Sequence, residues 1–398
     1  MARQWAWRLR WHALLWAGVL VLFLPVLAHW RLRGDFEPHT AYIVRMLAGE
    51  VSLTAELPNF LWHVSAGVPY ALIGGAPLDM YTTLASLLWY GALASVIFYA
   101  LCLAWGVPSA SLNGRDALLL CVLSWALMLV APLHNPATDN AYFGFIYPYV
   151  YHNPTMIPLR PTSLLLFLAC VWAFEAQVRP SWGQVLAVAG LALANIWAKP
   201  SYALVLLPSL GVLGLERLLR RRYIGWRMLV LGVGVPMVGL LGAQALSYQA
   251  GGMQFAPFLT YELWAYHYEP NANQHLLLKL LASLAFPLAV YGLYLRQAIR
   301  ELALNFAWLG MGAGLAFTYL FVDSGDPVAG NLAWNGQIAL MVLFVASGAF
   351  FLRMARLHAL HARLWVGAGV LGLHVVSGLW WYATHLTTDY LDLIYRVW

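Results

Sequence analysis

The chain has 398 residues, of which 62% are apolar and only 10% are charged, whereas soluble domains average about 45–50% apolar and about 25% charged residues. These figures exclude a water-soluble fold, a disordered chain, a collagen, a coiled coil and a disulfide scaffold, and they predict an integral membrane protein. The net charge of +6 is what the cytoplasmic loops of such a protein would carry, so the sequence predicts the lipid bilayer, and no nucleic acid, as a partner.

Eleven stretches are apolar and long enough to cross a bilayer, which takes roughly 20 residues per helix. They cover residues 11–29, 80–105, 116–134, 160–177, 182–198, 200–216, 228–247, 276–295, 303–322, 334–352 and 364–384. No polar block is long enough to form a separate soluble domain. We therefore expect a single all-α domain over residues 1–398, a polytopic transmembrane helix bundle whose first span is retained and not cleaved as a signal peptide.

A twelfth apolar run, residues 58–75, contains His63 and Pro69 and is expected to lie on the membrane without crossing it. Without this crossing, most of the 22 basic residues, including the run from Arg217 to Arg227, fall on one side and most of the 16 acids fall on the other. The side rich in arginine is the cytoplasmic one. We therefore expect the N-terminus inside, the C-terminus outside, and an amphipathic segment 58–75 within an outer loop over residues 30–79.

The first outer segment places Asp35, Glu37 and His39 within five residues, and Arg45 follows. If the segment is extended, the side chains of Asp35 and Glu37 share a face. Such a pair could bind a divalent cation, Mg or Mn, through its oxygens, or one carboxylate could act as a general base toward a hydroxyl. The alternative is that these residues are ordinary polar caps where the chain leaves the membrane.

The second outer segment combines Asp139, a run of aromatic residues from Tyr142 to Tyr151, and then His152 and Asn153. The aromatic side chains could stack on sugar rings or isoprenoid chains, or they could form an interfacial belt. A His-Asn-Pro-Thr turn at a membrane edge has no evident packing role. We therefore expect His152 and Asn153 to line a site.

Two cations, Arg160 and Lys199, each stand directly before a proline at the outer end of a span, where a helix is broken or just beginning. A cation beside helix N-terminal amides is suited to binding a phosphate, and the alternative is that each side chain simply extends to the membrane surface. A last outer turn near residues 322–334 contributes Asn331.

These features together resemble the membrane-embedded glycosyltransferases of the GT-C type. The matching residues are Asp35-Phe36-Glu37 in a long first outer loop, the segment 58–75 that does not cross the membrane, and basic residues on the outer face. The chain is also similar to a bacterial family of multi-pass membrane proteins of that kind, through the stretches GDFEPHTAYIVRMLAGE, PNFLWHVSAG, YHNPTMIPLRP, WAKPSYALVLLP and GNLAWNGQIALMVLF.

The resemblance implies a polyprenyl-phosphate sugar as donor, Asp35 as base or metal ligand, and Glu37 as the second acid. It allows Arg160 and Lys199 to hold the donor phosphate. Only a short tail follows the last span, which favours a lipid- or glycan-linked acceptor over a protein acceptor.

The predicted function is therefore sugar transfer from a polyprenyl-phosphate donor to a lipid- or glycan-linked acceptor, on the outer face of a bacterial inner membrane. The residues expected to bind substrate are His39, Arg45, Asp139, His152, Asn153, Arg160, Lys199 and Asn331. Two alternatives are a polymerase or ligase of lipid-linked glycans, and a non-catalytic membrane scaffold or transport subunit.

Overall fold

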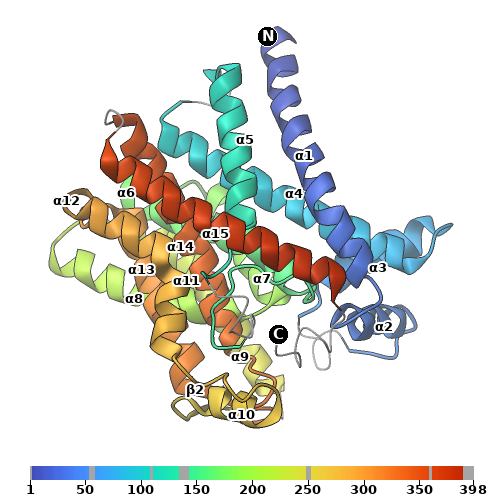
Figure 1. Ribbon diagram of the computed structural model, residues 1–398. Helices are drawn as coiled ribbons and strands as arrows, with labels where there is room; N and C mark the ends of the chain where they lie inside the picture. Colours follow the sequence, from blue (N-terminus) through green and yellow to red (C-terminus); the bar gives the residue numbers. More distant parts are fainter. Residues whose placement is uncertain are drawn as a thin grey trace.

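The computed structural model shown in Figure 1 describes residues 2–52, 59–107, 111–133, 143–247, 252–357 and 361–388. Helices make up 76% of it, and the described part contains one sheet, of two short strands. Because apolar side chains lie on the outside of the helices as well as between them, the helices are suited to a lipid surround. The predicted helical membrane bundle is confirmed at this level.

Nine helical stretches among the described residues are long and apolar enough to cross a membrane. They are α1 (Ala2–Trp30), α4 (Leu78–Trp105), α6 (Met156–Glu175), α8 (Ser201–Leu219), the π-helix η2 (Arg227–Gly234) continued by α9 (Val235–Ser247), α11 (Leu276–Leu293), α13 (Leu302–Leu320), α14 (Ala333–Leu357) and α15 (Ala362–Thr387).

Two of the predicted spans are short helices in the structure. α5 (Gly114–Met128) has 15 residues and α7 (Trp182–Ala198) has 17, against the roughly 20 that a straight crossing takes. Residues 129–133, which follow α5, are not helical. Their backbone is held to α15 and α11, because Ala131 N–H donates to His374 O at 3.1 Å and Leu133 N–H to Ala282 O at 3.1 Å. The count of eleven crossings and the orientation of the termini stay predictions.

The two ends of the bundle are defined by the ends of α4. Asp79 in its first turn pairs with Arg31 at 3.1 Å, and Trp105 at its last residue packs under the Arg356 guanidinium, 5.5 Å from the ring centroid. Twenty-eight helical residues separate these ends by about 42 Å. We call the end at Trp105 the basic end, because arginines gather at the helix ends there: Arg217, Arg220, Arg221, Arg222, Arg227, Arg296, Arg300, Arg353 and Arg356.

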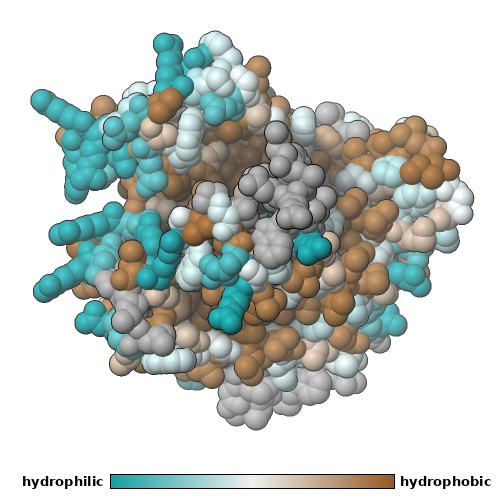
Figure 2. Space-filling view, turned by 90° about the horizontal axis from the view of Figure 1, so that it is seen from above, coloured by the Kyte–Doolittle hydropathy of each residue, from teal (hydrophilic) through white to brown (hydrophobic). Residues whose placement is uncertain are grey.

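The two figures agree on this polarity. In Figure 1, α12 (Leu295–Ala298) and one end of α8 lie at the left, and α2 (Phe36–Leu47) and α3 (Leu61–Ile73) lie together at the right. Figure 2 shows long hydrophilic side chains projecting from the left end, while hydrophobic side chains gather mainly toward the right of that face. Helix α3 holds 13 residues of the run 58–75, fewer than a straight crossing takes.

Residues 143–155 form a segment without regular structure that is buried inside the bundle. Of the two alternatives for its aromatic residues, the interfacial belt does not fit these positions, because Tyr149 is only 1% exposed. The backbone carbonyls are satisfied by distant side chains, because Trp381 Nε1 donates to Tyr149 O at 3.0 Å and an Arg160 Nη donates to Val150 O at 2.9 Å. Irregular backbone is tolerated within a membrane protein where protein groups satisfy it in this way.

A small cap of irregular structure joins two loops at the end opposite the basic end. Strands β1 (Met253–Phe255) and β2 (Phe321–Asp323) pair antiparallel, with Gln254 opposite Val322. The neighbouring helix α10 (Leu259–His267) is tied to the same loop, since Trp264 Nε1 donates to Val328 O at 2.8 Å.

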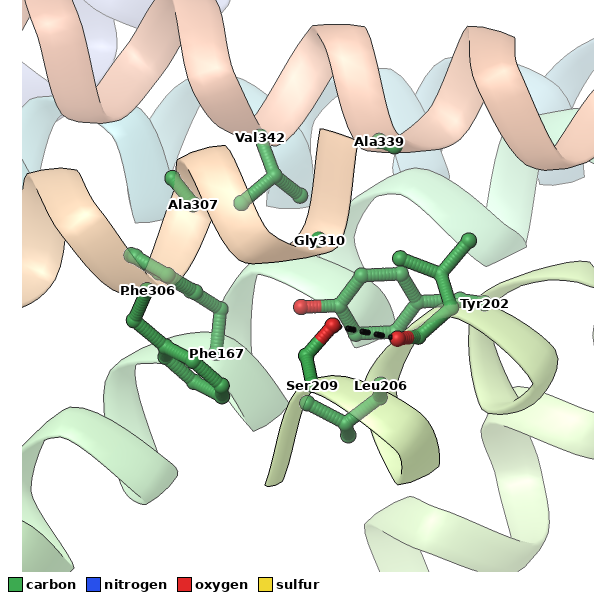
Figure 3. A pocket seen from close by; sticks show the side chains of 10 residues that line it. Phe167, Tyr202, Leu206, Ser209, Phe306, Ala307, Gly310, Ala339 and Val342 are labelled. Atoms are coloured by element: carbon green, nitrogen blue, oxygen red, sulfur yellow. Dashed lines mark hydrogen bonds between the residues drawn. The ribbon is translucent and has the colours of Figure 1, made fainter. Parts of the chain in front are cut away.

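The bundle core is tightly packed where α6, α8, α13 and α14 meet (Figure 3). The rings of Phe167 and Phe306 stack with centroids 5.5 Å apart, and Ser209 Oγ donates to the backbone carbonyl of Val205 at 2.7 Å. The remaining cavity, of about 10 Å³, is about the size that holds one water molecule. This part of the core therefore serves stability and has no room for a substrate.

Candidate functional site

Asp35 lies where the chain enters α2, and a distant loop fixes the orientation of its carboxylate. Asn153 Nδ2 donates to Asp35 Oδ2 at 2.8 Å. Asn153 is itself held, because its Oδ1 accepts from Thr155 Oγ1 at 2.8 Å and from the backbone N–H of Met156 at 3.3 Å. Two residues that the sequence singled out separately are thus in direct contact.

Lys199 lies at the junction of α7 and α8, on the same side as Asp35. Its ammonium is 4.7 Å from the centroid of the Trp334 ring, and it makes no hydrogen bond or ion pair with the described residues. Burial lowers the pKa of Lys199 to about 8, and the Asp35 carboxylate acts in the opposite direction. This half-buried cation therefore retains its capacity to bind an anionic group.

His39 and His63 form a pair beside this lysine. His39 Nδ1 and His63 Nε2 are 2.9 Å apart. Burial, then the neighbouring His63 and Lys199, lower the pKa of His39 to about 3, and burial lowers the pKa of His63 to about 4. Both rings are therefore neutral at pH 7, so one nitrogen of the pair donates and the other accepts. His63 was not among the residues predicted for the site, because its spacing from His39 gives no local signal for the contact.

We call this group the Asp35 cluster and define it by the residues Asp35, His39, His63, Asn153, Lys199 and Trp334. His152 lies behind it, with its ring parallel to that of His385 at 5.9 Å. Burial lowers the pKa of His152, the Asp35 carboxylate raises it and Arg160 lowers it further. His152 therefore lies within electrostatic reach of both the cluster and the buried arginine.

Arg160 is fully buried in the first turns of α6 and does not reach the membrane surface. One Nη donates to Val150 O at 2.9 Å, the other donates to Tyr90 Oη at 3.3 Å, and the guanidinium lies 5.1 Å from the Tyr149 ring centroid. No carboxylate of the described residues pairs with it. Among the described residues its charge is therefore not compensated by an acid, and together with Lys199 it outweighs the carboxylate of Asp35, which favours an anionic ligand.

The remaining predicted residues lie apart from this contact network or outside the described residues. Glu37 is exposed in the first turn of α2, and Arg45 is exposed with its guanidinium 5.4 Å from the Tyr42 ring centroid. Asn331 is exposed and donates to Asp323 Oδ2 at 3.2 Å. Asp139 lies outside the described residues.

The expectation that Asp35 and Glu37 share a face was wrong. It assumed extended backbone, whereas Asp35 already has helical angles, φ −67° and ψ −18°, and α2 begins at the next residue. Residues two apart in a helix do not face each other. Among the described residues, no three His, Cys, Asp or Glu side chains converge in a geometry that could hold a metal ion.

Comparison of the chain with models of protein families, with curated proteins and with solved structures finds no match.

Proposed function

We propose that the chain transfers a sugar from a polyprenyl-phosphate donor to a lipid- or glycan-linked acceptor, with the Asp35 cluster as the active site. The observation that carries this proposal is the juxtaposition of an oriented carboxylate, Asp35, with a half-buried lysine, Lys199, that has no bonded partner among the described residues. Proton removal and stabilisation of a leaving phosphate need these two kinds of group side by side.

In the proposed reaction, Asp35 accepts the proton of the acceptor hydroxyl while the hydroxyl oxygen attacks the anomeric carbon of the donor sugar. The bond between that carbon and the phosphate oxygen breaks, and the prenyl phosphate leaves with the electron pair. Lys199 stabilises the charge that develops on this phosphate, and the buried positive charge of Arg160 adds to the field. Asn153 keeps the Asp35 carboxylate directed at the hydroxyl.

The position of the cluster supports an outward-facing site in a bacterial inner membrane. The cluster is at the end of the bundle opposite the basic end, since Asp35 follows the end of α1 that is paired with the first turn of α4. Arginine-rich ends of membrane helices face the cytoplasm. The donor phosphate would then be bound at the outer surface, where its isoprenoid chain stays in the bilayer.

The test is sugar transfer by the purified protein in liposomes that contain polyprenyl-phosphate sugars and lipid-linked acceptors. Asp35→Asn is expected to lower the rate about 100- to 10,000-fold, the usual contribution of a general base. Asp79→Asn provides the matched control, because this acid is at the same end but is paired with Arg31, and it is expected to keep activity. Full activity of Asp35→Asn would exclude the proposed role.

A further inference from the structure

An apolar groove of about 580 Å³ separates α8 from η2 and α9. Leu207 and Gly211 line it on the α8 side, and Val230, Val235 and Gly239 line it on the other. Its volume lies within the range of about 300–1,000 Å³ that is typical of ligand pockets. Glycines on both walls leave room between the helices because they carry no side chain. The lining residues extend from the basic end into the middle of the spans.

The wall formed by η2 is a π-helix of eight residues, Arg227–Gly234. A π-helix is rare, and it occurs frequently at functional sites. Trp226, which precedes it, lines the groove and is 50% exposed. A half-exposed tryptophan at a helix end is typical of the headgroup level of a membrane, so the mouth of the groove is at that level.

The loop that joins the two walls lies at the basic end, beside the mouth of the groove, and carries three consecutive arginines. Arg220 pairs with Glu216 at 2.8 Å. Arg221 and Arg222 are exposed, and their side chains make no hydrogen bond or ion pair with the described residues. The rim of an otherwise apolar groove therefore presents positive charge with no bonded partner.

We propose that this groove binds an acyl chain of an anionic membrane phospholipid, whose phosphate is held by Arg221 and Arg222. Charge complementarity selects this occupant: the lining is apolar along the spans, and the rim carries two free guanidiniums where a headgroup would lie. A guanidinium binds a phosphate through paired N–H donors. The site is separate from the Asp35 cluster, because it is at the opposite end of the bundle.

The experiment measures lipid binding to the delipidated full chain in detergent, by titration with phosphatidylglycerol and with phosphatidylcholine of the same acyl chains. The wild type is expected to bind phosphatidylglycerol more tightly. The R221Q/R222Q variant is expected to weaken this binding about 30-fold, since each arginine near an anionic headgroup contributes about five-fold. R296Q/R300Q removes two exposed arginines at the same end and is expected to keep the wild-type Kd.

A second pair of variants tests the groove itself. A Cβ at Gly211 or at Gly369 would meet no atom within 4 Å, so a side chain can begin at either position without a clash. Gly211→Leu fills the groove and is expected to weaken phosphatidylglycerol binding, whereas Gly369→Leu, on α15, is expected to leave it unchanged.

Three results would overturn the proposal. Equal Kd values for the two phospholipids would show that charge is not recognised. Equal losses of phosphatidylglycerol binding in R221Q/R222Q and R296Q/R300Q would show that the lipid is attracted by the positive surface in general and not by a specific site. Undiminished binding by Gly211→Leu, or full competition by inorganic phosphate, would show that no acyl chain occupies the groove.

Discussion

The two ends of the bundle hold their charges in different ways. At the basic end, Arg217 donates to the backbone carbonyls of Phe174 and Tyr223, and Arg353 pairs with Glu301. At the other end, Lys199 has no bonded partner and Arg160 has no paired acid among the described residues. Many charges at helix ends follow from membrane sidedness and from helix capping. Incomplete pairing of buried charges is the feature that indicates a site.

The largest effect expected from this comparison is on sugar transfer, when the unpaired lysine is removed. Lys199→Met should lower the transfer rate about 100- to 1,000-fold, the usual cost of removing one group that stabilises transition-state charge. Thermal stability should stay close to that of the wild type, because Lys199 makes no hydrogen bond with the residues that the structure describes. Both are measured on the same preparation, in liposomes and by thermal unfolding.

Lys279 is the matched control, since it is a buried lysine at the same end with bonded partners. Its ammonium donates to Asn271 O at 2.8 Å and to Phe143 O at 3.3 Å. Lys279→Met should lower the free energy of unfolding by about 1–3 kcal/mol, because it leaves the buried carbonyl of Phe143 without this donor and removes the bond to Asn271. Transfer should fall far less than in Lys199→Met. Equal losses of activity and of stability in the two variants would contradict the assignment of Lys199 to the reaction and of Lys279 to the structure.

Acid pH should lower the free energy of unfolding through the histidine pair His39 and His63. The folded pKa values of His39 and His63, about 3 and about 4, lie below the unfolded value of about 6.5. Between the folded and the unfolded pKa values, the unfolded chain therefore binds more protons than the folded chain. The contribution of the two neutral histidines to the free energy of unfolding is complete above pH 6.5 and is lost as the pH falls below it. The loss is about 2 kcal/mol for each histidine at pH 5.

The measurement is the free energy of unfolding between pH 7.5 and pH 5, in the wild type and in the double variant H39Q/H63Q. Glutamine cannot titrate in this range, so the double variant should show a flatter dependence. His267→Gln, in the exposed part of α10, serves as control and should keep the wild-type slope. An unchanged slope in the double variant would contradict the assignment of this pH dependence to the pair.

The sequence predicts well those features that depend on hydropathy and on which helix ends lie at the same end of the bundle. Asp35, Asn153 and Lys199 were each assigned to the outer side, and the structure brings them into one cluster. Such a prediction needs no knowledge of packing. Because successive spans run in opposite directions, the end of one span and the start of the next lie at the same end of the bundle.

Contacts that form only in the folded chain could not be predicted. Residues 143–155 have the composition of an interfacial belt, yet they are buried. Their burial is possible because Trp381 on α15 donates to the carbonyl of Tyr149 and Arg160 on α6 donates to that of Val150. The His39–His63 contact likewise joins two helices. The shared face expected for Asp35 and Glu37 failed for a local reason, since helix α2 begins directly after Asp35.

A smaller effect is expected when the residue that orients Asp35 is changed. Asn153→Ala removes one hydrogen bond to a carboxylate, so kcat should fall about ten-fold, in line with the value of such a bond. KM for the donor should change little, because Asn153 contacts the acid and the adjacent turn of the chain. Steady-state kinetics separate these constants. An equal change in KM with constant kcat would make Asn153 a donor-binding residue and not a positioning one.

The smallest effect is expected at the basic end, where an ion pair joins α14 to the start of α13. The pair between Arg353 and Glu301 has side chains 36% and 22% exposed, and ion pairs near a surface contribute about 0–1 kcal/mol. Glu301→Gln should therefore change the free energy of unfolding by less than about 1 kcal/mol and leave transfer intact. A double-mutant cycle with Arg353→Gln measures the coupling directly. A coupling above about 2 kcal/mol, or a loss of transfer, would mean that pairing with an acid does not distinguish a structural charge from a reactive one.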